Sequence, residues 1–203
     1  MSGNVFFTSD THLGHANIIR FCQRPFDSLE EMDAELVRRW NAKVGEKDTV
    51  YHLGDVSFHK KPEAAKLLWS LNGNIILIAG NHDEKLLKHT WFNSRFLEIH
   101  SILERKVNDQ RIVFCHYAIE AWNKQHYGSW HVHGHSHGSL KSFGKRLDVG
   151  TDCFGYSPAS FDEVKALMDA KPIESHDYHQ PRDETGKIIG DKSDWTAWME
   201  QQK

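Results

Sequence analysis

An apolar run in the middle of the sequence ends abruptly in residues that combine turn and metal-binding chemistry. Residues 75–79 are all apolar, and Gly80, Asn81, His82 and Asp83 follow them directly. An apolar run of this length, bounded by turn residues, predicts a buried strand. Because functional groups in α/β sheets gather at the carboxyl ends of strands, the polar residues at this junction predict a functional site.

Four other β-prone segments end in the same way. They cover residues 5–9, 49–53, 111–115 and 129–133, and side chains that can bind a metal follow each of them. The five junctions supply seven candidate metal ligands: Asp10, His12, Asp55, Asn81, His116, His135 and His137. Imidazole nitrogens combined with carboxylate or amide oxygens suit divalent transition-metal ions better than Mg²⁺ or Ca²⁺, which prefer oxygen ligands. The pattern therefore predicts a centre for two such ions.

Length and composition indicate one globular domain. The chain has 203 residues, of which 39% are hydrophobic and 26% charged, and this suffices for a domain with its own core. The net charge of −3 does not suggest a surface for nucleic acid or a membrane, and no apolar run reaches membrane-spanning length. Three cysteines at no metal-ligand spacing favour a reducing cytoplasm.

Capping signals and apolar spacing predict the helices of the first half. A capping-box pattern at 28–31 introduces a helix over 29–43. A second helix is expected over 62–72, with proline in its favoured first turn, and a short one over 84–89. The strand–helix–strand order over 49–80 predicts a parallel pair of strands.

The second half is expected to form a further sheet. Residues 97–107 alternate as one strand, and a turn leads them back into 111–115 as a hairpin. Strands near 130–133 and 146–149 would complete an antiparallel or mixed sheet that faces the first. A second capping box, at 160–163, begins the last amphipathic helix.

The composition changes after the predicted domain, which covers residues 1–171. Residues 172–203 are polar, with little periodicity, and we expect a tail there. A short helix over 194–201 is possible at its end, and its tryptophans could dock on the domain or on a partner.

The order of the strand-end motifs strongly resembles that of the calcineurin-like metallophosphoesterases. The motifs are Asp-x-His at 10–12, Gly-Asp at 54–55, Gly-Asn-His-Asp at 80–83, His116, and Gly-His-x-His at 134–137. One such motif would carry little weight, whereas five in this order, each after a predicted strand, are specific. The resemblance implies an α/β fold in which two mixed β-sheets pack face to face as a sandwich flanked by helices.

The resemblance also implies a role for each ligand. The ligands of the first metal would be Asp10, His12 and His137, those of the second Asn81, His116 and His135, and Asp55 would bridge the two. A metal-bridging hydroxide would attack phosphorus, with His82 as general acid oriented by Asp83. Mn²⁺ is the favoured ion, although Fe, Co, Ni and Zn accept the same ligands.

The predicted function is hydrolysis of small nucleotide-type phosphodiesters. The alternatives are a phosphomonoesterase or pyrophosphohydrolase on the same site, a nuclease, and a non-catalytic binding scaffold; long nucleic acid is disfavoured because no basic groove is evident. His15, Arg20 and Arg24 are candidate substrate contacts, and for each arginine the alternative is an ordinary salt bridge. His52, His131 and His133 lie within predicted strands and are interpreted as structural. The oligomeric state stays open.

Overall fold

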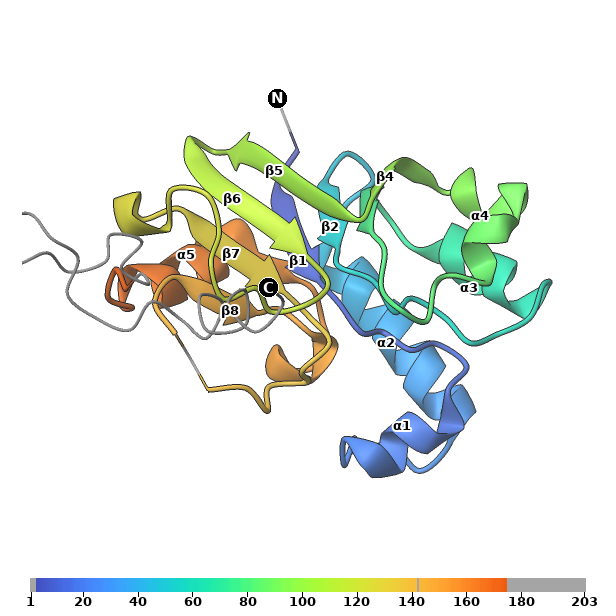
Figure 1. The fold of residues 1–203 in the computed structure, drawn as a ribbon. Coiled ribbons are helices and arrows are strands. Elements are labelled where there is room, and N and C mark those ends of the chain that lie inside the picture. Colours follow the sequence, from blue (N-terminus) through green and yellow to red (C-terminus); the bar gives the residue numbers. More distant parts are fainter. Residues whose placement is uncertain (1–2, 142, 175–203) are drawn as a thin grey trace, which may run out of the picture.

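The computed structural model describes residues 3–141 and 143–174, so the predicted helix at 194–201 lies outside the described residues. Two sheets form the centre of the fold (Figure 1). The first sheet has the order β4 (Phe96–His100), β3 (Asn74–Ile78), β2 (Thr49–His52), β1 (Val5–Thr8), β9 (Ala159–Ser160). The second has the order β5 (Ile102–Val107), β6 (Gln110–Cys115), β7 (Trp130–His133), β8 (Arg146–Asp148).

Both sheets are mixed, as predicted. In the first sheet, β1 to β4 are parallel and the short β9 runs antiparallel to β1. In the second, β5 and β6 form the predicted hairpin, while β6, β7 and β8 are parallel. The strand–helix–strand unit over 49–80 is confirmed, since β2 and β3 pair in parallel on either side of α3 (Glu63–Ser70).

Successive residues of the central strands enter two different hydrophobic clusters. Phe6 and Val50 face the helices, whereas Phe7 and Tyr51 face the second sheet. The aromatic ring of Phe114, from β6, stacks on Tyr51 with the centroids 4.6 Å apart. This alternation follows from the two-residue period of a strand, and it places the first sheet between a helical layer and the second sheet.

Two of the helices, α2 (Leu29–Lys43) and α5 (Phe161–Asp169), begin where the capping signals predicted. The structure also has α1 (Ala16–Phe21), α3 and α4 (Thr90–Asn93). The complete capping box at Ser160 and Glu163 precedes α5. At α2 only half of the expected box forms, because the Glu31 carboxylate accepts from the backbone of Asp27 instead of Ser28. In Figure 1, α2, α3 and α4 lie together on one side of the first sheet.

The prediction of a single strand over 97–107 is wrong. The segment divides at Ser101 into β4, which pairs with β3, and β5, which pairs with β6 in the other sheet. Sequence alternation continues through both strands, so it contains no sign of the crossing. The helix expected over 84–89 is also shorter than predicted, a single 3₁₀ turn at Leu86–Lys88.

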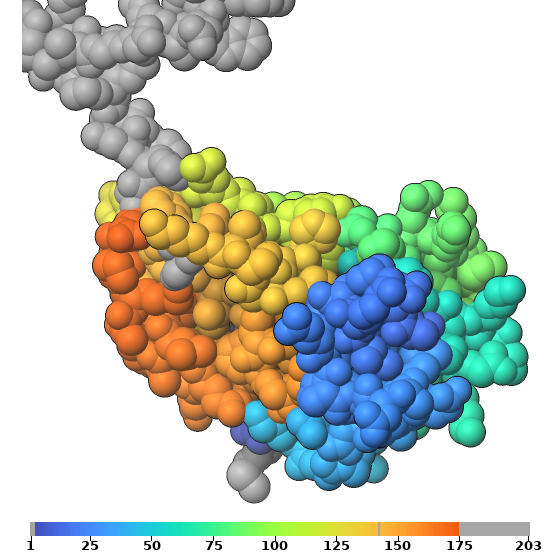
Figure 2. Space-filling model, turned by 90° about the horizontal axis from the view of Figure 1, so that it is seen from below, coloured from blue at the N-terminus to red at the C-terminus, as the bar shows by residue number. Residues whose placement is uncertain are grey.

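Early and late segments of the described chain pack side by side, as the blue and orange surfaces of Figure 2 show. The guanidinium of Arg39 donates to the carbonyl of Gly155 at 2.7 Å, and the Lys43 ammonium lies 3.0 Å from the Glu163 carboxylate. These contacts bring the loop after β8 and the start of α5 against α2. Within 3–141 and 143–174, no helix has the length and apolar character that a membrane crossing requires.

Candidate metal centre

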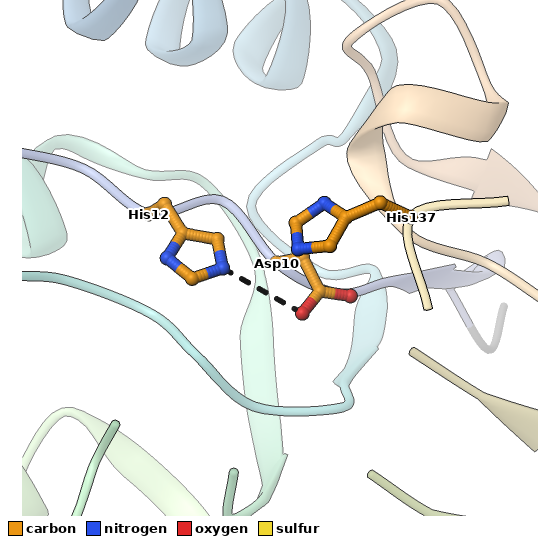
Figure 3. Close-up of side chains that lie close together, drawn as sticks. All are labelled: Asp10, His12 and His137. Carbon is orange, nitrogen blue, oxygen red and sulfur yellow. Dashed lines mark ion pairs between the residues drawn. The ribbon is translucent and has the colours of Figure 1, made fainter. Parts of the chain in front are cut away.

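The strand-end residues of both sheets meet at one edge of the sandwich. One ligand atom from each of Asp10, His12 and His137 lies within 4.8 Å of the others. Figure 3 shows both imidazole rings next to the Asp10 carboxylate, with the ion pair between His12 and Asp10 marked. Parallel strands end at a common edge, and for this reason residues separated by more than a hundred positions converge here.

A second group of side chains lies beside the first. One ligand atom from each of Asp55, His116 and His135 lies within 4.8 Å of the others. The amide oxygen of Asn81 is 3.1 Å from Nε2 of His116, so the side chain of Asn81 borders this group. All seven predicted ligands thus occupy one region of the structure.

The carboxylate of Asp55 lies between the two groups. Its Oδ2 is 3.7 Å from Nε2 of His12, in the first group, and 3.5 Å from Nε2 of His116, in the second. A carboxylate in this position can reach an ion in either group.

The backbone turns sharply at most of these residues. Five of the seven candidate ligands have positive φ: Asp10 (55°), His12 (49°), Asp55 (56°), His135 (66°) and His137 (46°). Asp, Asn and His tolerate the left-handed region better than most residues, yet each instance is uncommon, and such residues cluster at functional sites. The glycines of the motifs allow the loops to approach closely, because a Cβ at Gly80 would overlap the carboxylate of Asp55, and one at Gly134 that of Asp10.

Charges at the centre stabilise one another. Burial raises the pKa of Asp10 and of Asp55, but neighbouring histidines outweigh burial and hold the Asp10 pKa below its usual value and the Asp55 pKa at about 2. Burial lowers the pKa of His116, but the adjacent carboxylates raise it above its ordinary value. The field that favours a proton on this imidazole also favours a metal cation in its place.

Several buried polar atoms of the first group fit a bound cation. Oδ1 of Asp10 and both ring nitrogens of His12 have no hydrogen-bond partner among the described residues. A buried polar atom without a partner costs about 1–3 kcal/mol, and coordination of an ion would supply the missing partner. In the second group, Nδ1 of His116 lies 2.6 Å from the carbonyl oxygen of Leu53, which leaves Nε2 for a metal.

The expectation that Arg24 contacts substrate is wrong. Its side chain is buried, and the guanidinium forms a two-pronged ion pair with Asp152 at 2.8 and 2.9 Å. The Asp152 carboxylate also accepts from Nδ1 of His137 at 2.7 Å. Sequence analysis missed Asp152, although a signal was present, since it follows the strand at 146–149 as the other candidate residues follow their strands. Arg24 and Asp152 therefore position a ligand of the first group.

The predicted role of Asp83 also needs correction. Its buried carboxylate accepts from the backbone amides of Asp55, Val56 and Gly80, each at 2.9 Å. These bonds tie the Gly-Asp loop to the Gly-Asn-His-Asp loop, and no hydrogen bond joins this carboxylate to the ring of His82 within the described residues. Asp83 therefore holds the loop that carries Asp55, instead of orienting the imidazole.

His82 stands at the open side of the centre. Its side chain is 46% exposed, and Nε2 lies 3.9 Å from Oδ2 of Asp55. The ring of Phe58 lies between His82, at a centroid distance of 4.8 Å, and His15, at 4.1 Å. Arg20 is exposed on α1, with its guanidinium over the ring of Phe21.

The three histidines interpreted as structural are buried and hydrogen-bonded. Nε2 of His52 bonds to the Thr11 hydroxyl, and Nδ1 of His131 donates to the carbonyl of Val113. Nδ1 of His133 lies 2.9 Å from the carbonyl of Gly134. Their side chains support the strands and loops that carry the candidate ligands.

Comparison with known proteins agrees with this architecture. The profile of the calcineurin-like phosphoesterases matches residues 3–196. An uncharacterised protein of Methanocaldococcus jannaschii is 33% identical over 81% of this chain and 91% of its own length. The Gene 66 protein of Mycobacterium phage D29 is 26% identical over 81% of this chain and 96% of its own. The crystal structure of a protein of unknown function from Aquifex aeolicus shares the fold, with a TM-score of 0.64, 24% identity, and coverage of 81% of this chain and 99% of that one.

The chain belongs to the calcineurin-like phosphoesterase family. It is therefore a metal-dependent phosphoester hydrolase, and the predicted family and fold class are confirmed.

Proposed function

We propose that the protein is a phosphodiesterase that uses two transition-metal ions, with Mn²⁺ the favoured metal, to hydrolyse small nucleotide-type phosphodiesters. The observation that carries this proposal is the position of Asp55 Oδ2 between two groups of ligating side chains. Asp10, His12 and His137 would hold one ion, Asn81, His116 and His135 the other, and Asp55 would bind both. When bound, the ions act as Lewis acids on the phosphoryl oxygens and make water more acidic.

The protein's own residues account for the remaining chemistry. In hydrolysis the oxygen of water bonds to phosphorus, the ester P–O bond breaks, and the leaving oxygen takes up a proton. His82 is the group that can supply this proton, because its ring is accessible to substrate and histidine is the side chain that most often serves as a general acid. The contact with Phe58 restricts the ring of His82 on one side. The neutral amide of Asn81 leaves the centre more positive than a carboxylate would.

At the metal centre itself, the pairing of the two nearby arginines favours a diester over a monoester. A monoester dianion carries a second negative charge, for which further cationic side chains are useful partners. Of the two arginines nearest in sequence to the first motif, Arg24 is paired with Asp152 and Arg20 lies over Phe21.

The free thiols Cys22, Cys115 and Cys153 support a reducing compartment such as the cytoplasm.

Hydrolysis of bis-p-nitrophenyl phosphate in the presence of Mn²⁺ tests the proposal. We expect turnover to exceed that of the monoester p-nitrophenyl phosphate, and to fall by about 100-fold or more in His82→Ala and Asp55→Asn. Lys66→Ala, an exposed position on α3, is the control and should keep wild-type turnover. Full activity in Asp55→Asn would refute the metal assignment, and faster turnover of the monoester would favour a phosphomonoesterase.

A further inference from the structure

A cleft opens directly beside His82. It encloses about 660 Å³, and Asn81 and His82 of the Gly-Asn-His-Asp loop line it. Phe58 and Trp91 contribute aromatic surface to the same cleft. A volume of this size lies within the range that small-molecule ligands occupy in proteins. Because the candidate proton donor lines the cleft, the part of a substrate bound there would be the part that carries the leaving oxygen.

The wall of the cleft is positively charged. Lys60, Lys61 and Lys85 line it, and none of the three forms an ion pair within the part of the chain that the structure describes. Glu84, the acidic residue in the lining, is paired with Lys88 at 3.1 Å. The lining of the cleft therefore carries an excess of positive charge, in a chain whose net charge is −3. Clustered ammonium groups of this kind attract phosphate.

Aromatic rings stand next to these charges. Phe58 is 38% exposed, and its ring borders both His82 and the cleft. The ammonium of Lys61 lies 5.8 Å from the centroid of Trp91, so one cation and one aromatic face are presented together. Any nucleobase can stack on an aromatic side chain. A ring next to a cation can therefore contact both the base and the phosphate of one nucleotide.

We infer that this cleft binds the leaving half of the diester, and that this half is a nucleotide which carries a phosphate of its own. The inference rests on the proposed phosphodiesterase activity and adds the substrate class to it. The scissile phosphate lies at the metal centre, the leaving oxygen faces His82, the base packs on Phe58 or Trp91, and the second phosphate lies among Lys60, Lys61 and Lys85. The scissile phosphate stays with the other half of the diester, so the product released into the cleft is a nucleoside monophosphate.

Thymidine 3′,5′-bisphosphate matches the leaving half with the scissile phosphate still attached, so its direct binding to the metal-loaded full chain tests the subsite without requiring turnover. Isothermal titration calorimetry should show an affinity that falls at least tenfold in the double variant Lys60→Ala/Lys61→Ala and in Lys85→Ala. Lys66→Ala removes one lysine from the nearby α3 surface and should bind as the wild type does. Equal affinity in the wild type and the double variant would overturn the inference, whether or not the enzyme hydrolyses any diester.

Turnover of matched dinucleotides gives the second test. The dinucleotide dTpdT is compared with the same molecule phosphorylated at its 5′ end or at its 3′ end. We expect one phosphorylated form to have a kcat/KM at least tenfold above that of dTpdT, and the ratio to approach one in Lys60→Ala/Lys61→Ala. If the wild type cleaves the phosphorylated dinucleotides with kcat/KM values within twofold of the value for dTpdT, the inference is contradicted. Cleavage of dTpdT would still establish the diesterase activity. Failure to cleave bis-p-nitrophenyl phosphate would instead count against the proposed function.

Discussion

Replacement of Asp152 by asparagine is expected to weaken metal binding and to destabilise the fold. The Asp152 carboxylate serves two partners at once, the guanidinium of Arg24 and Nδ1 of His137. Asparagine keeps the shape but carries one acceptor oxygen in place of two and no charge. One partner therefore loses its acceptor, and Arg24, whose side chain is 0% exposed, loses its counter-charge.

The magnitude follows from the burial of the pair. The side chains of Arg24 and Asp152 are 0% and 8% exposed, and breaking a buried ion pair costs about 3–5 kcal/mol. For a chain of this size, a loss of about 3 kcal/mol lowers Tm by roughly 6–12 °C. Loss of a partner that orients a metal-binding histidine costs about 10–100-fold in metal affinity. The His137 site should lose affinity while the site with His116 keeps it, so the Mn²⁺ titration should become biphasic.

The assay uses metal-free protein prepared with a chelator. Urea unfolding measures the free energy of unfolding, and calorimetric titration with Mn²⁺ measures the two affinities. Leu68→Ala is the matched control, because Leu68 is buried in α3 away from the centre and its truncation costs about 2–5 kcal/mol. It should lose similar stability and keep both affinities. Wild-type Mn²⁺ binding in Asp152→Asn would refute the reasoning.

Three other predictions concern the core and the loops. Burial lowers the pKa of His131 from 6.5 to about 4. As pH falls from 6.5 to 4, the unfolded state therefore takes up a proton at this residue before the folded state does. The free energy of unfolding should fall by up to about 3 kcal/mol over this range. Urea titrations of metal-free His131→Gln should show a correspondingly flatter pH dependence, and equal slopes in both proteins would argue against this. Gly134→Ala should lower Mn²⁺ affinity more than tenfold, because its Cβ would overlap the Asp10 carboxylate. The control is Gly45→Ala, where the nearest atom would be 3.3 Å from the new Cβ, and it should keep the wild-type affinity. Equal Mn²⁺ affinities in the two variants would contradict the close packing of the loops. Phe114→Ala, which removes a fully buried ring, should cost about 3–5 kcal/mol in urea unfolding, and a loss below about 1 kcal/mol would contradict its central place in the core.

Local patterns in the sequence predicted most of the elements. Ser28 and Ser160 each marked the residue before a helix, because a capping hydroxyl acts on amides three positions away. The motif residues were found since each comes directly after a strand, and parallel strands bring their ends together whatever the details of packing. The boundary between β4 and β5 could not be predicted in this way, because both strands alternate alike and only their partners differ.

The sequence by itself predicted which residues could carry the chemistry of the site, through short motifs whose order along the chain is specific. The tertiary structure alone decided how those residues are used. Asp83 turned out to bind backbone amides, and Arg24 to pair with Asp152, 128 positions away. The physical reason is that a carboxylate or guanidinium takes whichever partner the folded chain brings within about 3 Å, and that distance is set by packing between segments and not by neighbours along the chain.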